Sequence, residues 1–421
     1  MKKRLFFLRG NQILRGTSIF LIGNVVVSGL AFAYHFVLAR LLGPQQYGIL
    51  AALFGLLYVV GVPMNALDFL VTKLISSFEP GKMISHTRGL LVYLGQRVGL
   101  ISLFMLPVLL LFSKSVQHFL NLPEVGPVVT IWVFIYLSLI ITVLRSVLKA
   151  WFRFTALVSN QIVEMAIRLI FSVVLVYSIS QWYGWGLVGV ILASIVVLFI
   201  NLFQAREIFK VPTSKFEHHK WPIKSLGLGG LLLSLSYTLM YSIDILLVKH
   251  FFNDYWTGIY AVLVTAGKVV YFAQAPLGSA MVPVVARKSH HPGRARSDLW
   301  LLLGVSGTIG ALIVGFYHLT AQVLITSVFS SKFIAAAPLI AWMGLAILGY
   351  SLANTCAGFL LALNKIKAAW ISLIGLGLEA AGIYFFHANL TQVVFSLSVV
   401  FGILAAVLII YSFYATRQNF E

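Results

Sequence analysis

The sequence predicts an all-α polytopic membrane protein with about 12 transmembrane helices, and three observations carry that prediction. Hydrophobic residues make up 60% of the 421-residue chain and charged residues only 10%, whereas soluble domains carry about 25% charged residues. A dozen apolar runs approach or exceed the roughly 20 residues that a helix needs to cross a bilayer core. Lys and Arg gather in alternate gaps between these runs, as expected for loops on the cytoplasmic side of a membrane.

The apolar runs set the predicted spans. The first run follows a basic N-terminal segment, and it is longer than the apolar core of a signal peptide, so we expect an uncleaved span. The twelve predicted spans are 17–40, 47–73, 87–113, 127–150, 155–180, 185–205, 223–249, 256–284, 299–325, 334–362, 368–387 and 391–414.

The distribution of cations predicts the orientation of these spans. Of the 30 Lys and Arg residues, 23 fall on one predicted side and four on the other. Because cytoplasmic loops are enriched in Lys and Arg, both termini are expected in the cytoplasm and the protein in the cytoplasmic (inner) membrane. The net charge of +19 is divided among short loops, so the expected partners of the cations are anionic membrane lipids and not nucleic acid.

The longest loop divides the chain almost equally. We expect an N-terminal six-helix bundle at 1–210, a cytoplasmic linker at 211–222 and a C-terminal six-helix bundle at 223–421. No loop is long enough for a soluble catalytic domain and no Walker A motif is present, so the sequence predicts neither an enzyme nor a bound cofactor. The single cysteine, Cys356, allows neither a disulfide framework nor a cysteine metal site, and no metal site is predicted.

The two halves share a pattern. A cation, a short turn, an aromatic residue and Gly-Ile occur in 39–49 and again in 248–259, and Glu164 matches Glu379. Since each half has six spans, the halves have the same orientation and are related by a parallel pseudo-two-fold axis along the membrane normal. Such a repeat favours a transporter with its site between the halves. The internal pseudo-dimer makes a monomer the expected state.

The segment from Arg40 to Gly48 also resembles a known family. Its signature residues are Arg40, Gly43, Pro44, Tyr47 and Gly48. With the chain length, span count and basic inner loops, it is similar to the polysaccharide biosynthesis (O-antigen flippase-type) proteins, which share a superfamily with multidrug extruders and lipid II flippases.

The resemblance implies a pair of six-helix bundles that opens alternately to each side of the membrane. It also implies a substrate of lipid-linked oligosaccharide, usually polyprenyl-diphosphate-linked, used in polysaccharide biosynthesis. The alternative within the superfamily is a cation-coupled multidrug extruder, for which an acidic cavity is expected. A membrane-embedded glycosyltransferase or polymerase fits less well because the predicted outer loops are short, and the apparent repeat speaks against a non-transporting scaffold.

Charged residues inside spans are costly and are candidates for function. Lys268 lies near the middle of the eighth span and shares a helix face with Tyr260 and Tyr271. An ammonium there suits the diphosphate of such a substrate, and pairing with a carboxylate for structure is the alternative. Arg97 in the third span has no charged neighbour one turn away. Arg168 lies four residues after Glu164, which predicts an ion pair within the fifth helix.

Several further residues are candidates by type and position. Arg145 lies near the inner end of the fourth span, where it can gather diphosphate or reach lipid headgroups. Tyr237 and Tyr241 share a predicted helix face with Asp244, an arrangement that suits sugar binding as well as core packing. The carboxylates that could carry a coupling Na⁺ or H⁺ are Asp68, Asp244, Glu164 and Glu379.

Overall fold

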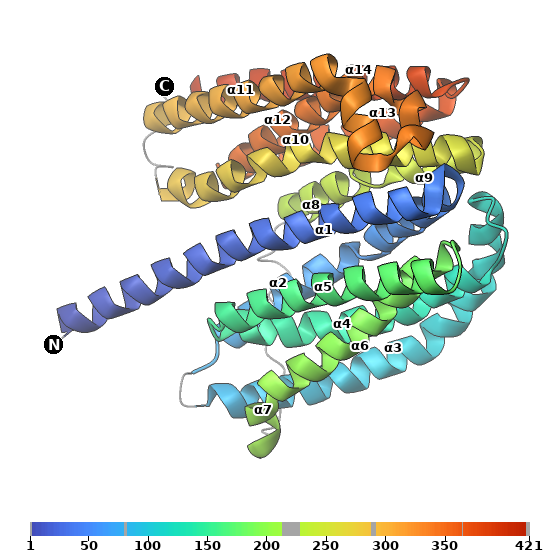
Figure 1. The fold of residues 1–421 in the computed structure, drawn as a ribbon. Helices are drawn as coiled ribbons and strands as arrows, with labels where there is room; N and C mark the ends of the chain where they lie inside the picture. The colour runs from blue at the N-terminus through green and yellow to red at the C-terminus, as the bar shows by residue number, and fades with distance from the viewer. Residues whose placement is uncertain (1, 80–81, 213–227, 288–291, 364, 418–421) are drawn as a thin grey trace. The chain divides into compact units, whose positions relative to one another are not determined.

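The computed structural model describes all residues except 1, 80–81, 213–227, 288–291, 364 and 418–421. In these ranges the regular structure is helical, which confirms the predicted fold class (Figure 1). Two short irregular helices occur, a π-helix at Ile325–Phe329 and a 3₁₀-helix at Ser331–Leu339. The long helices follow the apolar runs of the sequence because a helix satisfies its own backbone hydrogen bonds in lipid.

The helices divide into two compact units. Unit 1 comprises residues 1–38 and 60–225, and unit 2 comprises residues 39–59 and 226–421. The helices of unit 1 are the first part of α1 (Lys2–Val60), α2 (Val62–Ser76), α3 (Met83–Phe119), α4 (Gly126–Ala150), α5 (Phe154–Ser178), α6 (Gly184–Gln204) and α7 (Arg206–Lys210). Those of unit 2 are the last part of α1, α8 (Leu228–Met240), α9 (Ile243–Phe251), α10 (Asp254–Arg287), α11 (Pro292–Leu324), α12 (Ile340–Ala362), α13 (Lys367–Phe385) and α14 (Leu390–Arg417).

Ten helical segments among the described residues are long and apolar enough to cross a membrane. One of them, Ile22–Ser76, has 55 residues, which is more than twice the roughly 20 residues of one crossing. It covers the first two predicted spans. The third predicted span falls on α3. The apolar segment of this helix, Phe104–Phe119, is shorter than a full span and is not among the ten. The difference from twelve therefore concerns the counting of these spans and not the helical class.

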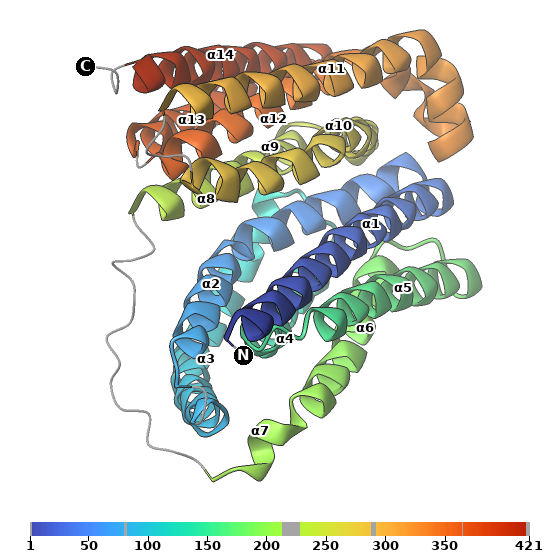
Figure 2. The ribbon, with the colours of Figure 1, turned by 90° about the vertical axis from the view of Figure 1, so that its left-hand side faces the viewer.

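Unit 1 is built around α4. This helix packs against α2, α3, α5 and α6, and α5 lies beside α6 in both ribbon views (Figures 1 and 2). Buried aliphatic side chains of α2, α3, α4 and α7 form a core that includes Val71, Leu90, Val147 and Ile208. These residues come from four helices, so the core fixes the end of α4 that carries Arg145 and Lys149.

Unit 2 is built around α12. This helix packs against α10, α11 and α14, while α13 packs against α8 (Figure 2). Small residues allow the close approach: a Cβ atom on Gly349 would lie 3.0 Å from the backbone of Phe401 on α14. Close packing of small residues is characteristic of helices in membranes.

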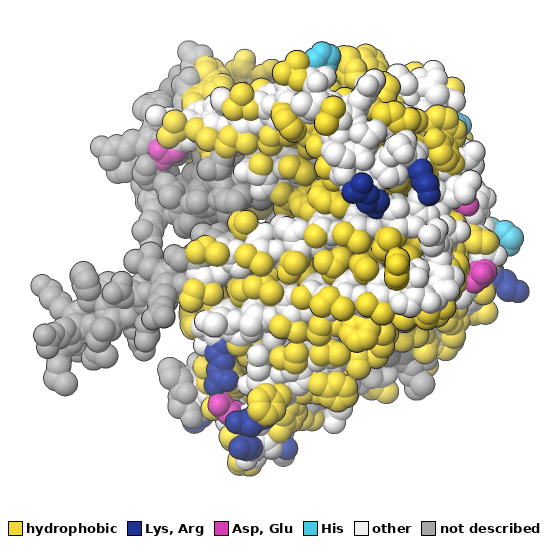
Figure 3. All heavy atoms as spheres, in the orientation of Figure 1, with side chains coloured by type: hydrophobic (Ala, Val, Ile, Leu, Met, Phe, Trp, Pro, Cys, Tyr) yellow, Lys and Arg dark blue, Asp and Glu magenta, His cyan; other side chains and the backbone are white. Residues whose placement is uncertain are grey.

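The surface is largely apolar. Hydrophobic side chains cover most of the face drawn in Figure 3, and charged side chains there are few. Large side chains such as Leu111, Tyr177 and Leu319 are about four-fifths exposed. A soluble protein would not expose so many of these residues, and in a bilayer they would contact lipid tails.

The segment after the first predicted span differs from the expected turn. Helix α1 continues through it with a single kink at Gly43, where φ is 72° and ψ is 175°. This backbone conformation suits glycine because it has no side chain. The kink lets residues 39–59 pack with unit 2 while 1–38 pack with unit 1.

The predicted seventh span is also not one continuous helix. It consists of α8 and α9, which are separated at Tyr241 and Ser242, and Ser242 has φ −143°. Tyr237 and Asp244 therefore lie on two different helices, although Tyr241 and Asp244 line the same cavity. Interrupted helices at membrane depth occur where the backbone is buried in protein or lines a cavity.

Candidate functional site

Asp244 is the centre of a polar cluster in unit 2. It lies in the first turn of α9, directly after the break, and is 6% exposed. Its Oδ2 accepts a hydrogen bond of 2.8 Å from the hydroxyl of Tyr260 on α10, and its Oδ1 accepts one of 2.8 Å from the Ile245 backbone N–H. Because the N-terminal end of a helix favours negative charge, the break in the helix stabilises a carboxylate at this position.

Lys268 is the cation of the same cluster. Its ammonium lies 3.6 Å from the centroid of the Tyr241 ring and 5.8 Å from that of Tyr58. The carboxylate of Asp244 is close enough to interact electrostatically with the ammonium of Lys268. A cation over an aromatic face is attracted by the ring, so Lys268 is held by Tyr241 and Asp244 together. This geometry favours the alternative prediction, a lysine balanced by a carboxylate.

Glu379 completes the cluster from α13. It is fully buried, and among the described residues neither of its carboxylate oxygens has a hydrogen-bond partner. The carboxylate of Asp244 is close enough to interact electrostatically with that of Glu379. A buried carboxylate without partners is costly, so Glu379 needs a proton or a nearby cation.

Tyrosines surround these three residues. Tyr271 lies between Tyr241 and Tyr350, with ring centroids 6.3 Å and 5.6 Å away, and the Tyr350 hydroxyl donates to the backbone carbonyl of Tyr237 at 2.9 Å. Asp244, Lys268 and the rings of Tyr241, Tyr271 and Tyr350 line a small cavity that has room for roughly one water molecule. The cavity therefore accommodates a small ion or a water and not a sugar or a diphosphate.

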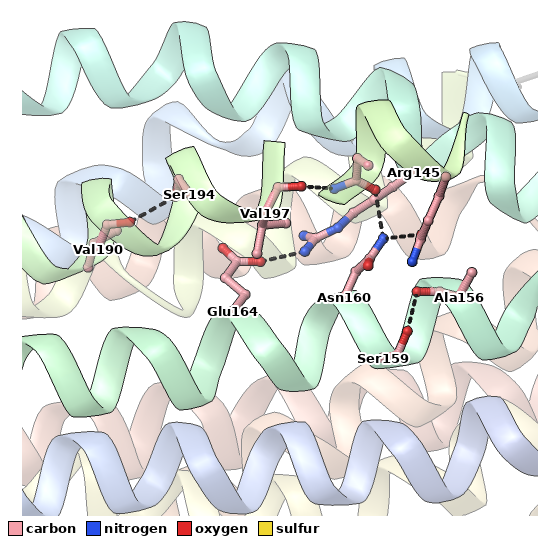
Figure 4. Close-up of polar contacts among 10 residues, drawn as sticks. Arg145, Ala156, Ser159, Asn160, Glu164, Val190, Ser194 and Val197 are labelled. Atoms are coloured by element: carbon pink, nitrogen blue, oxygen red, sulfur yellow. Dashed lines mark hydrogen bonds and ion pairs between the residues drawn. The ribbon is translucent and has the colours of Figure 1, made fainter. Parts of the chain in front are cut away.

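Arg145 and Glu164 form the tightest ion pair of unit 1. Nη2 of Arg145 on α4 lies 2.5 Å from Oε2 of Glu164 on α5, and the two side chains are 20% and 15% exposed (Figure 4). Beside them, the Asn160 side-chain amide donates to Oδ1 of Asn201 at 2.8 Å and to Oε1 of Gln204 at 2.9 Å. The pair joins two helices, whereas the sequence predicted a pair between Glu164 and Arg168 within one helix.

Replacing Glu164 with glutamine is expected to destabilise unit 1. The change leaves the guanidinium of Arg145 largely buried without its carboxylate, which costs about 1–3 kcal/mol. The matched control is Glu207→Gln, because Glu207 pairs with Arg153 at 2.7 Å but is 51% exposed, and exposed pairs contribute about 0–1 kcal/mol. Thermal unfolding of the purified protein measures both. Equal effects of the two substitutions would contradict this assignment.

Asp68 and Lys149 form a second interhelical pair in unit 1. Oδ2 of Asp68 on α2 lies 2.8 Å from Nζ of Lys149 on α4, and Oδ1 accepts a hydrogen bond of 2.7 Å from Ser146. Asp68 and Glu164, which were candidates for carrying an ion, are thus both occupied by cations of α4. The two pairs fix α4 between α2 and α5.

The other two predicted cations of unit 1 contact aromatic rings. The guanidinium of Arg168 lies 4.3 Å from the centroid of the Tyr34 ring, and that of Arg97 lies 5.5 Å from the Tyr93 ring. Arg97 is exposed, and no ion pair of Arg97 occurs within the residues that the structure describes. Arg97 is therefore available to an anion.

The signature segment packs its backbone against the start of α10. A Cβ atom on Gly258 would lie 1.9 Å from the carbonyl oxygen of Pro44, and one on Gly48 would lie 2.6 Å from the Gly258 nitrogen. Tyr47 is fully buried, and its hydroxyl lies 3.2 Å from that of Thr265. Arg40 donates to the Ser327 carbonyl at 3.0 Å. These residues therefore hold the helix ends of unit 2 together.

Some residues of the clusters were not singled out from the sequence as site residues. Tyr350 is a single tyrosine within an apolar span, and the sequence offers only its polarity as a signal. Tyr58 comes from the last part of α1, far from α10 along the chain, so nothing in the spacing predicts its position near Lys268. The pairing of Asp68 with Lys149 is likewise a result of how α2 packs on α4.

The comparisons with known proteins agree with this architecture. The model of a family described as "Polysaccharide biosynthesis protein" matches residues 37–338. No curated protein gives a significant sequence match.

Solved structures give similar folds at low identity. A structure described as "Lipid II flippase MurJ, inward closed conformation" has a TM-score of 0.73 and 13% identity, over 94% of this chain and 87% of that chain. An inward-facing multidrug resistance MATE family transporter of the MOP superfamily has a TM-score of 0.72 and 11% identity, over 92% of this chain and 94% of the other. An outward-facing multidrug resistance MATE family transporter has a TM-score of 0.66 and 13% identity, over 97% of this chain and 95% of the other.

These matches are to transporters and not to enzymes. The family match covers more than half of the chain, and the fold matches extend over nearly all of it. The chain belongs to the polysaccharide biosynthesis protein family, and its fold is similar to the folds of the lipid II flippase and MATE transporter structures.

Proposed function

We propose that this protein moves a lipid-linked oligosaccharide, carried on a polyprenyl diphosphate, across the cytoplasmic membrane by alternating access. The observation that carries the proposal is the family match over residues 37–338 in a chain with a transporter fold. A transporter that serves polysaccharide biosynthesis has a glycan precursor as its natural cargo. Such a precursor is too polar to cross a bilayer unaided.

The cations of unit 1 suit the diphosphate of that substrate. Arg97 lies near the middle of α3, is exposed, and has an aromatic ring as its described contact. A guanidinium binds phosphate oxygens through two parallel hydrogen bonds. Arg168 is the second candidate, because it is a guanidinium within the predicted fifth span, and it lies 4.3 Å from the centroid of the Tyr34 ring. Arg145 is occupied by Glu164, so a role in binding substrate would require that pair to open.

Replacing Arg97 with alanine is expected to slow substrate movement by roughly tenfold to a hundredfold. The reason is the loss of charge-assisted hydrogen bonds worth about 1.5–3 kcal/mol, at about 1.4 kcal/mol for each factor of ten. The measurement is transbilayer movement of a fluorescent diphospho-polyprenyl oligosaccharide in proteoliposomes. Arg97→Lys is expected to retain part of the rate, because it keeps the charge but not the bidentate geometry.

Lys114→Ala is the matched control, because Lys114 is an exposed cation on the same helix, near its outer end. It is expected to leave the rate close to native. Equal losses in the two variants would contradict a specific role for Arg97. No movement by the native protein with any of several glycans, combined with extrusion of cationic dyes, would favour the multidrug extruder instead.

The remaining parts of the proposal concern ions and location. Asp244 and Glu379 are the proposed carboxylates for a coupling ion, because Asp68 and Glu164 are already paired with Lys149 and Arg145. The excess of Lys and Arg on one predicted side supports both termini in the cytoplasm. We propose a monomer, since each chain supplies both helical units.

A further inference from the structure

The cluster around Asp244 contains more acidic than basic groups. Asp244 and Glu379 are both buried, at 6% and 0% exposure, and Lys268 lines the same small cavity as Asp244. Tyr260 satisfies one oxygen of Asp244, but Glu379 has no hydrogen-bond partner in the described ranges. Buried charges require compensation. Lys268 can balance one of the two carboxylates, and a proton on Glu379 balances the other.

Lys268 does not form a direct ion pair with a carboxylate of the described residues. Within the part of the chain that the structure describes, no carboxylate oxygen lies within the 4.0 Å that defines an ion pair with its ammonium. Its contact is the face of Tyr241, at 3.6 Å from the ring centroid. The adjoining cavity, lined by Asp244, Lys268, Tyr271 and Tyr350, has room for roughly one water molecule.

An aromatic face, a carboxylate and a small enclosed space are the features by which proteins bind small cations. In this cluster the three features surround the end of a lysine side chain. The ammonium therefore takes the position that a free cation would otherwise occupy. Since Tyr241 and Asp244 flank the break between α8 and α9, the site is formed by an interrupted helix, as ion sites of transporters often are.

We infer that Lys268 is a built-in counter-cation that fills a small-cation site formed by Asp244 and Tyr241. The native protein consequently needs no Na⁺ at this place, which leaves H⁺ as the coupling ion for the carboxylates of this cluster, and shortening Lys268 converts the cluster into a binding site for a free small cation. This inference concerns the occupant of the site and does not rest on which substrate is moved.

The test is the thermal unfolding of purified full-length protein in three chloride salts at equal ionic strength. The salts are those of Na⁺, of n-propylammonium, which resembles the end of a lysine side chain, and of N-methylglucammonium, which is too large for the cavity. Lys268→Ala is expected to gain a saturable rise in its unfolding temperature from Na⁺ or n-propylammonium, about 2–4 °C for each kcal/mol of binding. Native protein is expected to unfold at the same temperature in all three salts.

Two further variants separate binding from general salt effects. Lys268→Met removes the charge but refills the space. It is therefore expected to need at least roughly ten times more of the small cation than Lys268→Ala for the same rise in unfolding temperature. Arg97→Ala removes a cation from unit 1 and is expected to respond like native protein. A cation response of the native protein, or none in Lys268→Ala, would overturn the inference.

A folding failure would also be informative. If Lys268→Ala yields no folded protein, the double variant Asp244→Asn with Lys268→Ala is measured instead. Because it removes one carboxylate with the cation, it is expected to fold and to show no response to Na⁺. Failure of this double variant to fold would overturn the inference, since the loss would then not come from charge. A flipping assay is not needed for any of these outcomes, so they are independent of the proposed function.

Discussion

Replacing Gly258 with alanine is expected to lower the free energy of unfolding by at least about 3 kcal/mol, the upper part of the range for overpacking. The added Cβ atom would lie 1.9 Å from the carbonyl oxygen of Pro44 and 2.5 Å from its carbonyl carbon. Both are backbone atoms, so no side chain can rotate to make room. The kinked part of α1 must then move away from α10, and the buried Tyr47 with it.

The measurement is the unfolding temperature and the yield of folded protein. Gly304→Ala on α11 is the matched control, because a Cβ atom there meets no atom within 4 Å; it is expected to be neutral or slightly stabilising, since alanine favours a helix more than glycine does. Gly48→Ala is expected to behave like Gly258→Ala, because its Cβ atom would lie 2.4 Å from the Asp254 carbonyl oxygen. Native-like stability of Gly258→Ala would show that this backbone contact does not exist.

Neutralising one charge of the Asp244 cluster is expected to be more harmful than neutralising two. Asp244→Asn leaves the ammonium of Lys268 without its carboxylate, and Lys268→Met leaves Asp244 without its cation. Removing one partner of a buried charge pair costs about 3–5 kcal/mol, whereas replacing both is often neutral. The double variant Asp244→Asn with Lys268→Met is therefore expected to be more stable than either single variant.

A double-mutant cycle by thermal unfolding measures this coupling. Glu79→Gln is the control for loss of an exposed carboxylate, since Glu79 is 76% exposed and pairs with Lys82 at 3.4 Å. Its effect is expected to lie within about 1 kcal/mol. If the destabilisation of the double variant equals the sum of the two single effects, Asp244 and Lys268 do not balance each other.

The two groups of charged residues have different consequences for the proposed transport cycle. In unit 1 the carboxylates are tied to cations of neighbouring helices, Asp68 to Lys149 and Glu164 to Arg145. In unit 2 the cluster keeps a carboxylate without a described hydrogen-bond partner and a cavity of about one water. An ion that drives transport must bind and leave, and a group already held in an ion pair is poorly suited to that.

The helical membrane class can be predicted from the sequence alone, and the family resemblance carried by the segment from Arg40 to Gly48 agrees with the match over residues 37–338. These features depend on local composition and spacing, because a span across the bilayer needs a run of apolar residues and cytoplasmic loops are enriched in cations. The unusual polarity of positions such as Lys268, Asp244 and Glu379 was also visible, because any charge within an apolar run is costly. The predicted parallel repeat remains a prediction.

Which charged residues pair with one another depends on the tertiary structure. Spacing along the chain predicted a pair between Glu164 and Arg168, but Glu164 lies 2.5 Å from Arg145 of another helix. It also decided that the seventh span breaks between Tyr241 and Asp244, and that residues 39–59 pack with unit 2. The physical reason is the same in each case. Partner choice depends on how helices rotate and approach one another, and these are set by packing over the whole unit and not by the residues of any one helix.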